Sequence, residues 1–437
     1  MTQGRLAWLD ALRGWAAIIV AAFHVSPLVL GTTLHLRIFG VIDLGKYGVL
    51  LFFLVSGYVI PMSLERHGDL RRFWVGRLLR IYPAYLLAVA VALVLGAAGM
   101  MRMPAQLTSE TTTAVLGHVT MLQDLLGTRG VVRPFWTLSF EMIFYLLVAG
   151  LFVWSGRRGT VWWAAGLTVL AAAGPPDALL GATADGRRIT AVLAFVLVAG
   201  GLCAYLISRR PLVLAAGAAG ICTAALPLLN GHATDEVTSR SSAQAAQMLA
   251  VMFAGTVLFR LQHRQIRPPA AVAALVLVTA GVAVQIRPSV AVAVAATFAL
   301  AWAMRTRRVP AVLTRLGVIS YSLYLLHIPV LAVVRRLTDD PLVTAVAFAA
   351  GSLAAAWAGH RWVERPAQAL ARRVVSPPPA GKQVLTGVPR TAVMVAARDQ
   401  DPAHGLARRD ARIRGRRRGA LPPEPVRHRH PQPSADL

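Results

Sequence analysis

Apolar residues occur along this chain in long runs that short polar segments interrupt. A bilayer core about 30 Å thick is crossed by roughly 20 apolar residues in a helix, because lipid tolerates no unpaired backbone. The runs that approach this length cover 13–30, 47–64, 81–101, 136–155, 160–174, 189–207, 211–229, 243–260, 269–286, 288–304, 314–334 and 341–361. The run at 160–174 is short, and only Arg287 and Pro288 divide the ninth run from the tenth. We therefore predict an all-α polytopic transmembrane helix bundle of about 10–12 spans within residues 1–375.

Composition and charge agree with a membrane protein. The 437 residues are 56% hydrophobic and 15% charged, with a formal net charge of +26. The cations lie between the apolar runs and near the C-terminus, so we expect a lipid bilayer as partner and no nucleic acid. The first run contains Arg13 and His24, unlike the uncharged core of a cleaved signal peptide, and is predicted to be a retained span.

The distribution of arginines predicts the orientation. Arginines gather after the second, fourth, sixth, eighth and tenth runs, for example in 66–80 and 305–315, whereas most loop acids lie in the opposite connections. Short cytoplasmic loops hold the excess of basic residues, so both ends of the chain are expected in the cytoplasm. The segment 376–437, rich in proline and arginine, cannot bury a core, and we expect a disordered cytoplasmic tail there.

The first run carries two ionisable residues on one helix face. Arg13 and His24 are eleven residues apart. At about 100° and 1.5 Å per residue, they point the same way and lie about 16 Å apart along the axis. A histidine deep in the bilayer needs a polar partner or a water-filled cavity, so His24 is a candidate functional group. The alternative is a histidine that packs and bonds to a neighbouring helix.

A basic stretch follows the second run. Arg77 and Arg80 are three residues apart and can face the same way on a helical turn, so two guanidinium groups could hold one phosphate. The alternative is that these arginines only set the topology. Ser56, in the second run, is a weaker candidate, because a serine in a span usually bonds its own helix backbone.

Two further runs carry polar groups inside the membrane. Glu141 lies in the fourth run and must be neutralised or paired, for which His24 or an arginine would serve. The eleventh run contains His327 beside tyrosine and serine hydroxyls, with packing and site roles both open.

Several other chemistries find no support. His118 with Asp124, and His232 with Asp235, lack the spacing of a zinc site, so we expect no metal. The sequence has neither a Gly-x-Ser-x-Gly elbow nor a phosphate-binding Gly-Lys loop.

These polar blocks, in their order along the chain, resemble the acyltransferase-3 family of integral membrane acyltransferases. The resemblance rests on residues 9–14 with His24, 52–58, 77–83, 136–145, 320–327 and 362–366. It implies that His24 is catalytic with Arg13 as its partner, that Arg77 and Arg80 hold the phosphate of coenzyme A, and that Glu141 is the essential acidic group. Ser56, Tyr82, Trp136, Tyr321 and His327 would support the site. One departure is Thr137, where the family more often has serine.

The family implies a function: transfer of an acyl group, most simply acetyl, from acyl-coenzyme A to a hydroxyl of a sugar-containing acceptor such as a glycan, glycolipid or macrolide. It also implies a bacterial cytoplasmic membrane. The chain leaves no room for a fused esterase-like domain, so a stand-alone transferase is expected.

Two other classes of protein stay open. One is a secondary transporter, although the short link between the sixth and seventh runs and the lack of similar halves disfavour it. The other is a non-catalytic partner in glycan assembly or lipid translocation.

Overall fold

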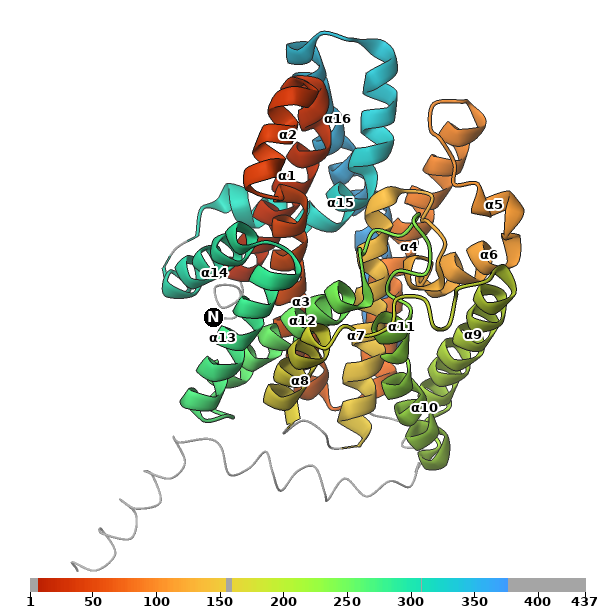
Figure 1. The fold of residues 1–437 in the computed structure, drawn as a ribbon, viewed down its shortest axis with the longest axis vertical. Coiled ribbons are helices and arrows are strands. Elements are labelled where there is room, and N and C mark those ends of the chain that lie inside the picture. Colours follow the sequence, from red (N-terminus) through yellow and green to blue (C-terminus); the bar gives the residue numbers. More distant parts are fainter. Residues whose placement is uncertain (1–6, 155–158, 308, 376–437) are drawn as a thin grey trace, which may run out of the picture. The chain divides into compact units, whose positions relative to one another are not determined.

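The computed structural model describes residues 7–154, 159–307 and 309–375, which fold into helices joined by short connections (Figure 1). The α-helices are α1 (Ala7–Val29), α2 (Gly31–Val41), α3 (Leu44–His67), α4 (Leu70–Ala97), α5 (Gln106–Ser109), α6 (Thr111–Thr120), α7 (Trp136–Val153), α8 (Thr160–Ala172), α9 (Ala184–Ile207), α10 (Arg210–Cys222), α11 (Ala225–Leu229), α12 (Ser242–Gln262), α13 (Pro268–Gln285), α14 (Pro288–Ala303), α15 (Ala311–Leu337), α16 (Pro341–Gly359) and α17 (Arg365–Val375). A π-helical turn, His360–Glu364, joins α16 to α17. The predicted tail, 376–437, lies outside the described residues.

The helical membrane bundle is confirmed. Ten segments of the described chain are long and apolar enough to cross a membrane. The two shorter apolar helices are α8 and α14, which correspond to the short fifth run and to the second half of the pair divided at Arg287. The span count therefore falls at the lower end of the predicted range.

The third span begins earlier than predicted. The arginine-rich stretch was expected to be a connection, with the helix starting at residue 81, but α4 begins at Leu70. The Asp69 carboxylate accepts a hydrogen bond from the backbone N–H of Arg72 (3.0 Å) and caps the helix. Hydropathy marks where a helix enters the apolar region, whereas a capped helix can extend well beyond it. Arg77 and Arg80 consequently stand one turn apart on a continuous helix.

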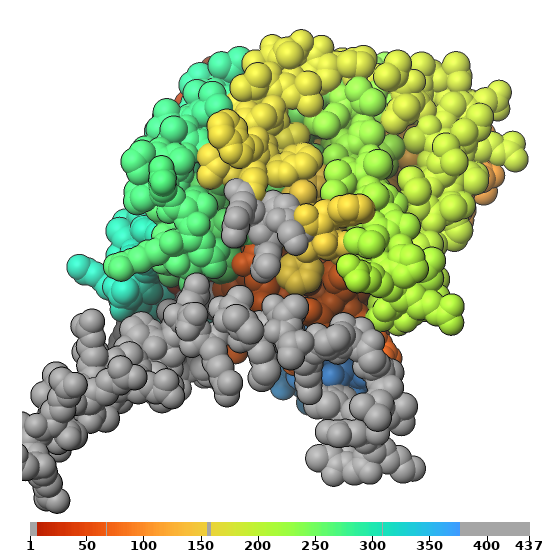
Figure 2. Space-filling view, turned by 90° about the horizontal axis from the view of Figure 1, so that it is seen from below, coloured from red at the N-terminus to blue at the C-terminus, as the bar shows by residue number. Residues whose placement is uncertain are grey.

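The core of the bundle surrounds α12, which is buried along nearly its whole length. This helix packs against α3 and α8, while α1 packs against α15 and α3. Helices α13 and α14 lie on one side of this core, and α9 and α10 lie on the other (Figure 1). Seen from below, the orange-red α3–α4 region lies at the centre of the face, beside the yellow α7 and α8 (Figure 2).

Two helix crossings depend on glycine pairs. A Cβ atom at Gly57 of α3 would lie 1.8 Å from the Met252 carbonyl oxygen of α12, and one at Gly255 would lie 2.1 Å from the Leu54 oxygen. At the crossing of α1 with α15, a Cβ at Gly317 would lie 2.0 Å from the Asp10 oxygen. Small residues allow such close backbone approach between membrane helices. Since Gly57 follows Ser56 and Gly14 follows Arg13, the crossings fix the backbone beside two candidate site residues.

We expect Gly57→Ala to destabilise the bundle strongly. The added methyl group would meet backbone, which cannot rotate away, so α3 and α12 must separate. Overpacking of this kind typically costs about 1–3 kcal/mol or more. The melting temperature of the detergent-solubilised protein measures the effect. Gly76→Ala is the matched control, because a Cβ at Gly76 meets no atom within 4 Å; equal melting temperatures for the two variants would contradict the prediction.

Candidate functional site

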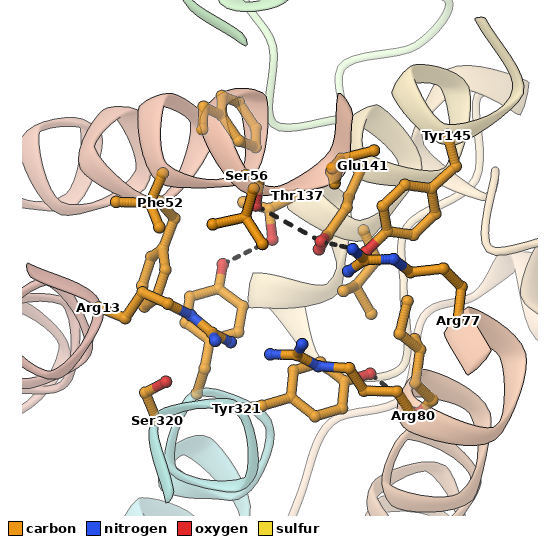
Figure 3. Close-up of a pocket in the computed structure, with 17 residues that line it drawn as sticks. Arg13, Phe52, Ser56, Arg77, Arg80, Thr137, Glu141, Tyr145, Ser320 and Tyr321 are labelled. Carbon is orange, nitrogen blue, oxygen red and sulfur yellow. Dashed lines mark hydrogen bonds between the residues drawn. The ribbon is translucent and has the colours of Figure 1, made fainter. Parts of the chain in front are cut away.

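A polar pocket opens between α1, α3, α4, α7 and α15 (Figure 3). Its polar lining consists of Arg13, Ser56, Arg77, Arg80, Thr137, Glu141, Tyr145, Ser320, Tyr321 and Tyr324. Six residues that the sequence singled out, drawn from all five helices, therefore meet in one place: Arg13, Ser56, Arg77, Arg80, Glu141 and Tyr321. The walls between them are apolar, with Phe52, Phe53 and Val55 among the lining residues.

The pocket has an excess of positive charge. Arg13, Arg77 and Arg80 line it together with a single carboxylate, that of Glu141. In Figure 3 the guanidinium groups of Arg13 and Arg80 point toward each other across the pocket. Within the described part of the chain, none of the three arginines has a carboxylate partner at ion-pair distance. Converging guanidinium groups without carboxylate partners form a site that suits a phosphate or another anion.

Aromatic rings hold Arg77 in place. Its guanidinium carbon lies 5.5 Å from the centre of the Phe73 ring and 5.4 Å from that of Tyr145. Cations over aromatic faces are attracted by the ring quadrupole, more strongly where water is excluded. Arg77 is 8% exposed, so its orientation in the pocket is set before any ligand binds.

Hydroxyl groups hold Glu141. Tyr145, one turn further along α7, donates a short hydrogen bond to the Glu141 carboxylate, and Ser56 of α3 donates a longer one (3.5 Å). The expected ion pair with His24 or an arginine does not form among the described residues, because two hydroxyls take that place. Ser56 also differs from expectation, since it bonds across to α7 as well as lining the pocket.

The two intramembrane histidines form a second cluster, outside the pocket lining. His24 Nδ1 lies 2.8 Å from the Val20 carbonyl oxygen and 3.2 Å from His327 Nε2. The ring of Tyr324 contacts His327, with centroids 6.0 Å apart, and also lines the pocket. The histidine pair therefore lies one side chain beyond the pocket.

Two predicted supporting residues lie elsewhere. The Tyr82 hydroxyl donates to the Val119 carbonyl oxygen (2.7 Å), and the Trp136 ring lies 4.4 Å from the Lys46 ammonium nitrogen. Neither lines the pocket. Conversely, Tyr145 and Tyr324 were not chosen from the sequence. Tyr145 is four residues after Glu141 and Tyr324 three before His327, so helical spacing alone would have indicated both.

No group of three potential metal ligands occurs in the described residues. His118, which the sequence argued against as a zinc ligand, instead holds the loop before α7. Its Nδ1 donates to the Ala114 oxygen (2.7 Å), and its Nε2 accepts from the Val131 N–H (3.1 Å). Only neutral histidine can make both bonds.

This loop should loosen in acid. Burial lowers the pKa of His118 below its usual 6.5. When the loop opens, His118 is exposed to water and regains its usual pKa. Below about pH 6.5 the open state therefore binds more protons than the folded state, so acid favours opening of the loop. We expect hydrogen exchange of the Val131 amide, corrected for the intrinsic rate, to become faster between pH 7.5 and pH 5. In His118→Gln, which has no titrating group, this pH dependence should vanish; its persistence would contradict the assignment.

A bundle of membrane-length helices around a cationic pocket defines an integral membrane protein with a polar, arginine-lined pocket among its helices. Residues 6–361 match the family model described as an acyltransferase domain. The chain therefore belongs to the acyltransferase-3 family.

Individual relatives are distant. Over 148 residues the chain is 27% identical to the acyltransferase MdmB of Streptomyces mycarofaciens, covering 32% of this chain and 38% of that protein. Over 138 residues it is 29% identical to a protein of Acidianus two-tailed virus assigned as an acetyltransferase, covering 31% of this chain and 38% of the other. The alignments thus span well under half of these relatives' lengths. No solved structure matches.

Proposed function

We propose that this protein is a membrane-bound O-acyltransferase that moves an acyl group, most simply acetyl, from acyl-coenzyme A to a hydroxyl of a sugar-containing acceptor. The observation that carries the proposal is the pocket in which Arg13, Arg77 and Arg80 converge without carboxylate partners. A phosphate group of coenzyme A is an anion that these three guanidinium groups can bind. Membership of the acyltransferase-3 family supports acyl transfer as the chemistry.

The donor is proposed to enter from the cytoplasmic side of a bacterial inner membrane, with both chain ends on that side. This orientation rests on the distribution of arginines. Phosphate groups would bind Arg77 and Arg80, with Arg13 facing them. The pantetheine arm would then extend past Tyr324 toward His24, because Tyr324 lies between the pocket and the histidine pair.

In the reaction, neutral His24 acts as general base. It takes the proton of the acceptor hydroxyl while the oxygen attacks the thioester carbonyl, and a C–O bond forms as the C–S bond breaks. The proton then passes from the imidazolium to the departing sulfur, which leaves as the coenzyme A thiol. General-base catalysis of this kind contributes about 10²–10⁴-fold to a rate. A variant route forms an acyl-enzyme on His24 before transfer, and both routes release one thiol per acyl group.

Purified protein in detergent, supplied with radiolabelled acetyl-coenzyme A and glycolipid or macrolide acceptors, tests the proposal. We expect release of free thiol together with labelled acceptor. Label that stays on the protein when acceptor is omitted would indicate the acyl-enzyme route. Absence of both binding and thiol release with acetyl- and longer acyl-coenzyme A would contradict the proposal and favour a transporter.

A further inference from the structure

His24 of α1 and His327 of α15 make a direct contact inside the membrane. His24 Nδ1 and His327 Nε2 are 3.2 Å apart, and the ring centroids are 5.0 Å apart. His327 is 1% exposed. A contact between two imidazole nitrogens is a hydrogen bond only if one nitrogen carries a proton and the other does not, so the tautomers of the pair are linked.

The partners of His327 determine its tautomer. Its Nδ1 lies 2.8 Å from the Tyr324 carbonyl oxygen and 3.2 Å from that of Leu323. Carbonyl oxygens only accept hydrogen bonds, so Nδ1 of His327 must carry the proton. In the neutral ring, Nε2 is then an acceptor, and it is this atom that faces His24.

The same reasoning then determines the tautomer of His24. Its Nδ1 lies between two acceptors, the Val20 oxygen at 2.8 Å and Nε2 of His327 at 3.2 Å. The proton of His24 must therefore reside on Nδ1, shared between them. This assignment leaves Nε2 of His24 with a free lone pair, which is the form that a general base requires.

We propose that His327 is a positioning residue for acyl transfer, whose Nε2 accepts the Nδ1 proton of His24 and thereby keeps Nε2 of His24 available as the base. The proposal rests on the proposed function, in which His24 takes the proton of the acceptor hydroxyl. During that step Nε2 of His24 gains the proton, while Nδ1–H stays bonded to His327 and to the Val20 oxygen. The imidazolium is thus stabilised by two acceptors that are in place beforehand.

The helix packing supports a fixed relation between the two rings. Helices α1 and α15 cross where Gly14 meets Leu313 and Gly317 meets Asp10, with no space for a side chain between the backbones. The crossing fixes the register of the two helices about two to three turns below the histidines. A histidine that only filled space would not need an acceptor nitrogen aimed at His24.

His327→Leu and His327→Gln separate positioning from packing. Leucine fills much of the volume but cannot accept a hydrogen bond, whereas the glutamine carboxamide can accept one near the position of Nε2. We expect His327→Leu to lower kcat about 10²-fold, because a base held in the wrong tautomer loses much of its catalytic effect. KM for acyl-coenzyme A should stay within about 3-fold, since the arginine pocket is unchanged. His327→Gln should recover kcat to within about 10-fold of wild type.

A spectroscopic measurement reports on the pair without relying on activity. Solid-state NMR of ¹⁵N-histidine-labelled protein in bilayers distinguishes Nδ1–H from Nε2–H, and the His24 signal is the one that disappears in His24→Ala. Wild type and His327→Gln should show Nδ1–H at His24. His327→Leu should show a mixture of Nδ1–H and Nε2–H, because only the Val20 oxygen remains as an acceptor for the Nδ1 proton.

The outcomes separate this proposal from the proposed function. Full transfer by His24→Ala would overturn the function assigned to His24, while NMR would still report whether the pair exists. If transfer needs His24 but the leucine and glutamine variants have equal kcat, and His24 keeps Nδ1–H in both, the positioning role of His327 is overturned. Equal loss of kcat in both variants together with lower melting temperatures would likewise reduce His327 to a packing residue.

Discussion

Replacing His24 with glutamine should lower kcat for acyl transfer by about 10³-fold, the largest single-residue effect expected in this protein. Glutamine retains polarity and much of the size of histidine but cannot take a proton near neutral pH. Binding of acyl-coenzyme A should persist, because His24 does not line the arginine pocket. Thiol release at saturating donor measures kcat, and binding of labelled donor in the absence of turnover measures Kd.

The matched control is His263→Gln. His263 follows α12, and its Nδ1 contacts the Phe259 carbonyl oxygen of the same chain segment (2.8 Å), far in sequence from any pocket residue. This variant should transfer acyl groups at the wild-type rate. If His24→Gln matched it, the general base would have to be sought elsewhere.

The double variant Arg77→Gln/Arg80→Gln should raise Kd for acyl-coenzyme A by at least about 10²-fold. A hydrogen bond to a charged group contributes about 1.5–3 kcal/mol, and each 1.4 kcal/mol is about tenfold in Kd. If the two contacts add, their loss amounts to about 3–6 kcal/mol, which is about 10²–10⁴-fold in Kd. Equilibrium binding of labelled acyl-coenzyme A in detergent measures the change.

The same helix offers a control for the charge alone. Arg71 and Arg72 are exposed in the first turn of α4 and do not line the pocket. Arg71→Gln/Arg72→Gln removes the same charge and should change Kd less than about 3-fold at physiological salt, where exposed charges are screened. Equal weakening in the two double variants would mean that α4 attracts the donor through its general charge instead of binding its phosphates in the pocket.

The membrane bundle could be predicted because hydropathy reports the one property that lipid demands of every span. The short fifth run and the pair of runs divided at Arg287 were already visible as exceptions, and the two shorter helices, α8 and α14, lie there. The start of α4 could not be predicted in this way, because a helix capped by Asp69 continues outside the apolar region. The glycine crossings were likewise hidden, since a sequence shows which residues are small but not which helices meet there.

Only some residues of the candidate site could be predicted, because the sequence does not show directly which way each side chain points. Glu141 was identified as an ionisable group inside the membrane, Arg77 and Arg80 as a phosphate-binding pair in a basic stretch, and Arg13 by its place on the His24 face. The structure brings these four residues to one pocket. Tyr82 was expected to support the site because it belongs to the same block of the family resemblance as Arg80, residues 77–83. Two residues turn a helix by about 200°, so Tyr82 faces away from the pocket and bonds to Val119 instead. Residues that are close in the sequence therefore share a site only if the helix turns their side chains to the same face.

Helix α15 carries residues of both clusters along one face, because Tyr321 and Tyr324 line the pocket and His327 meets His24. Six residues of helix between Tyr321 and His327 amount to about 9 Å along the axis. A helix does not stretch, so this spacing sets a fixed distance between the proposed phosphate site and the proposed base. In this protein, the length of acyl donor that the proposed site accepts would then be set by side chains along the path, such as the one at position 324, and not by movement of one end relative to the other.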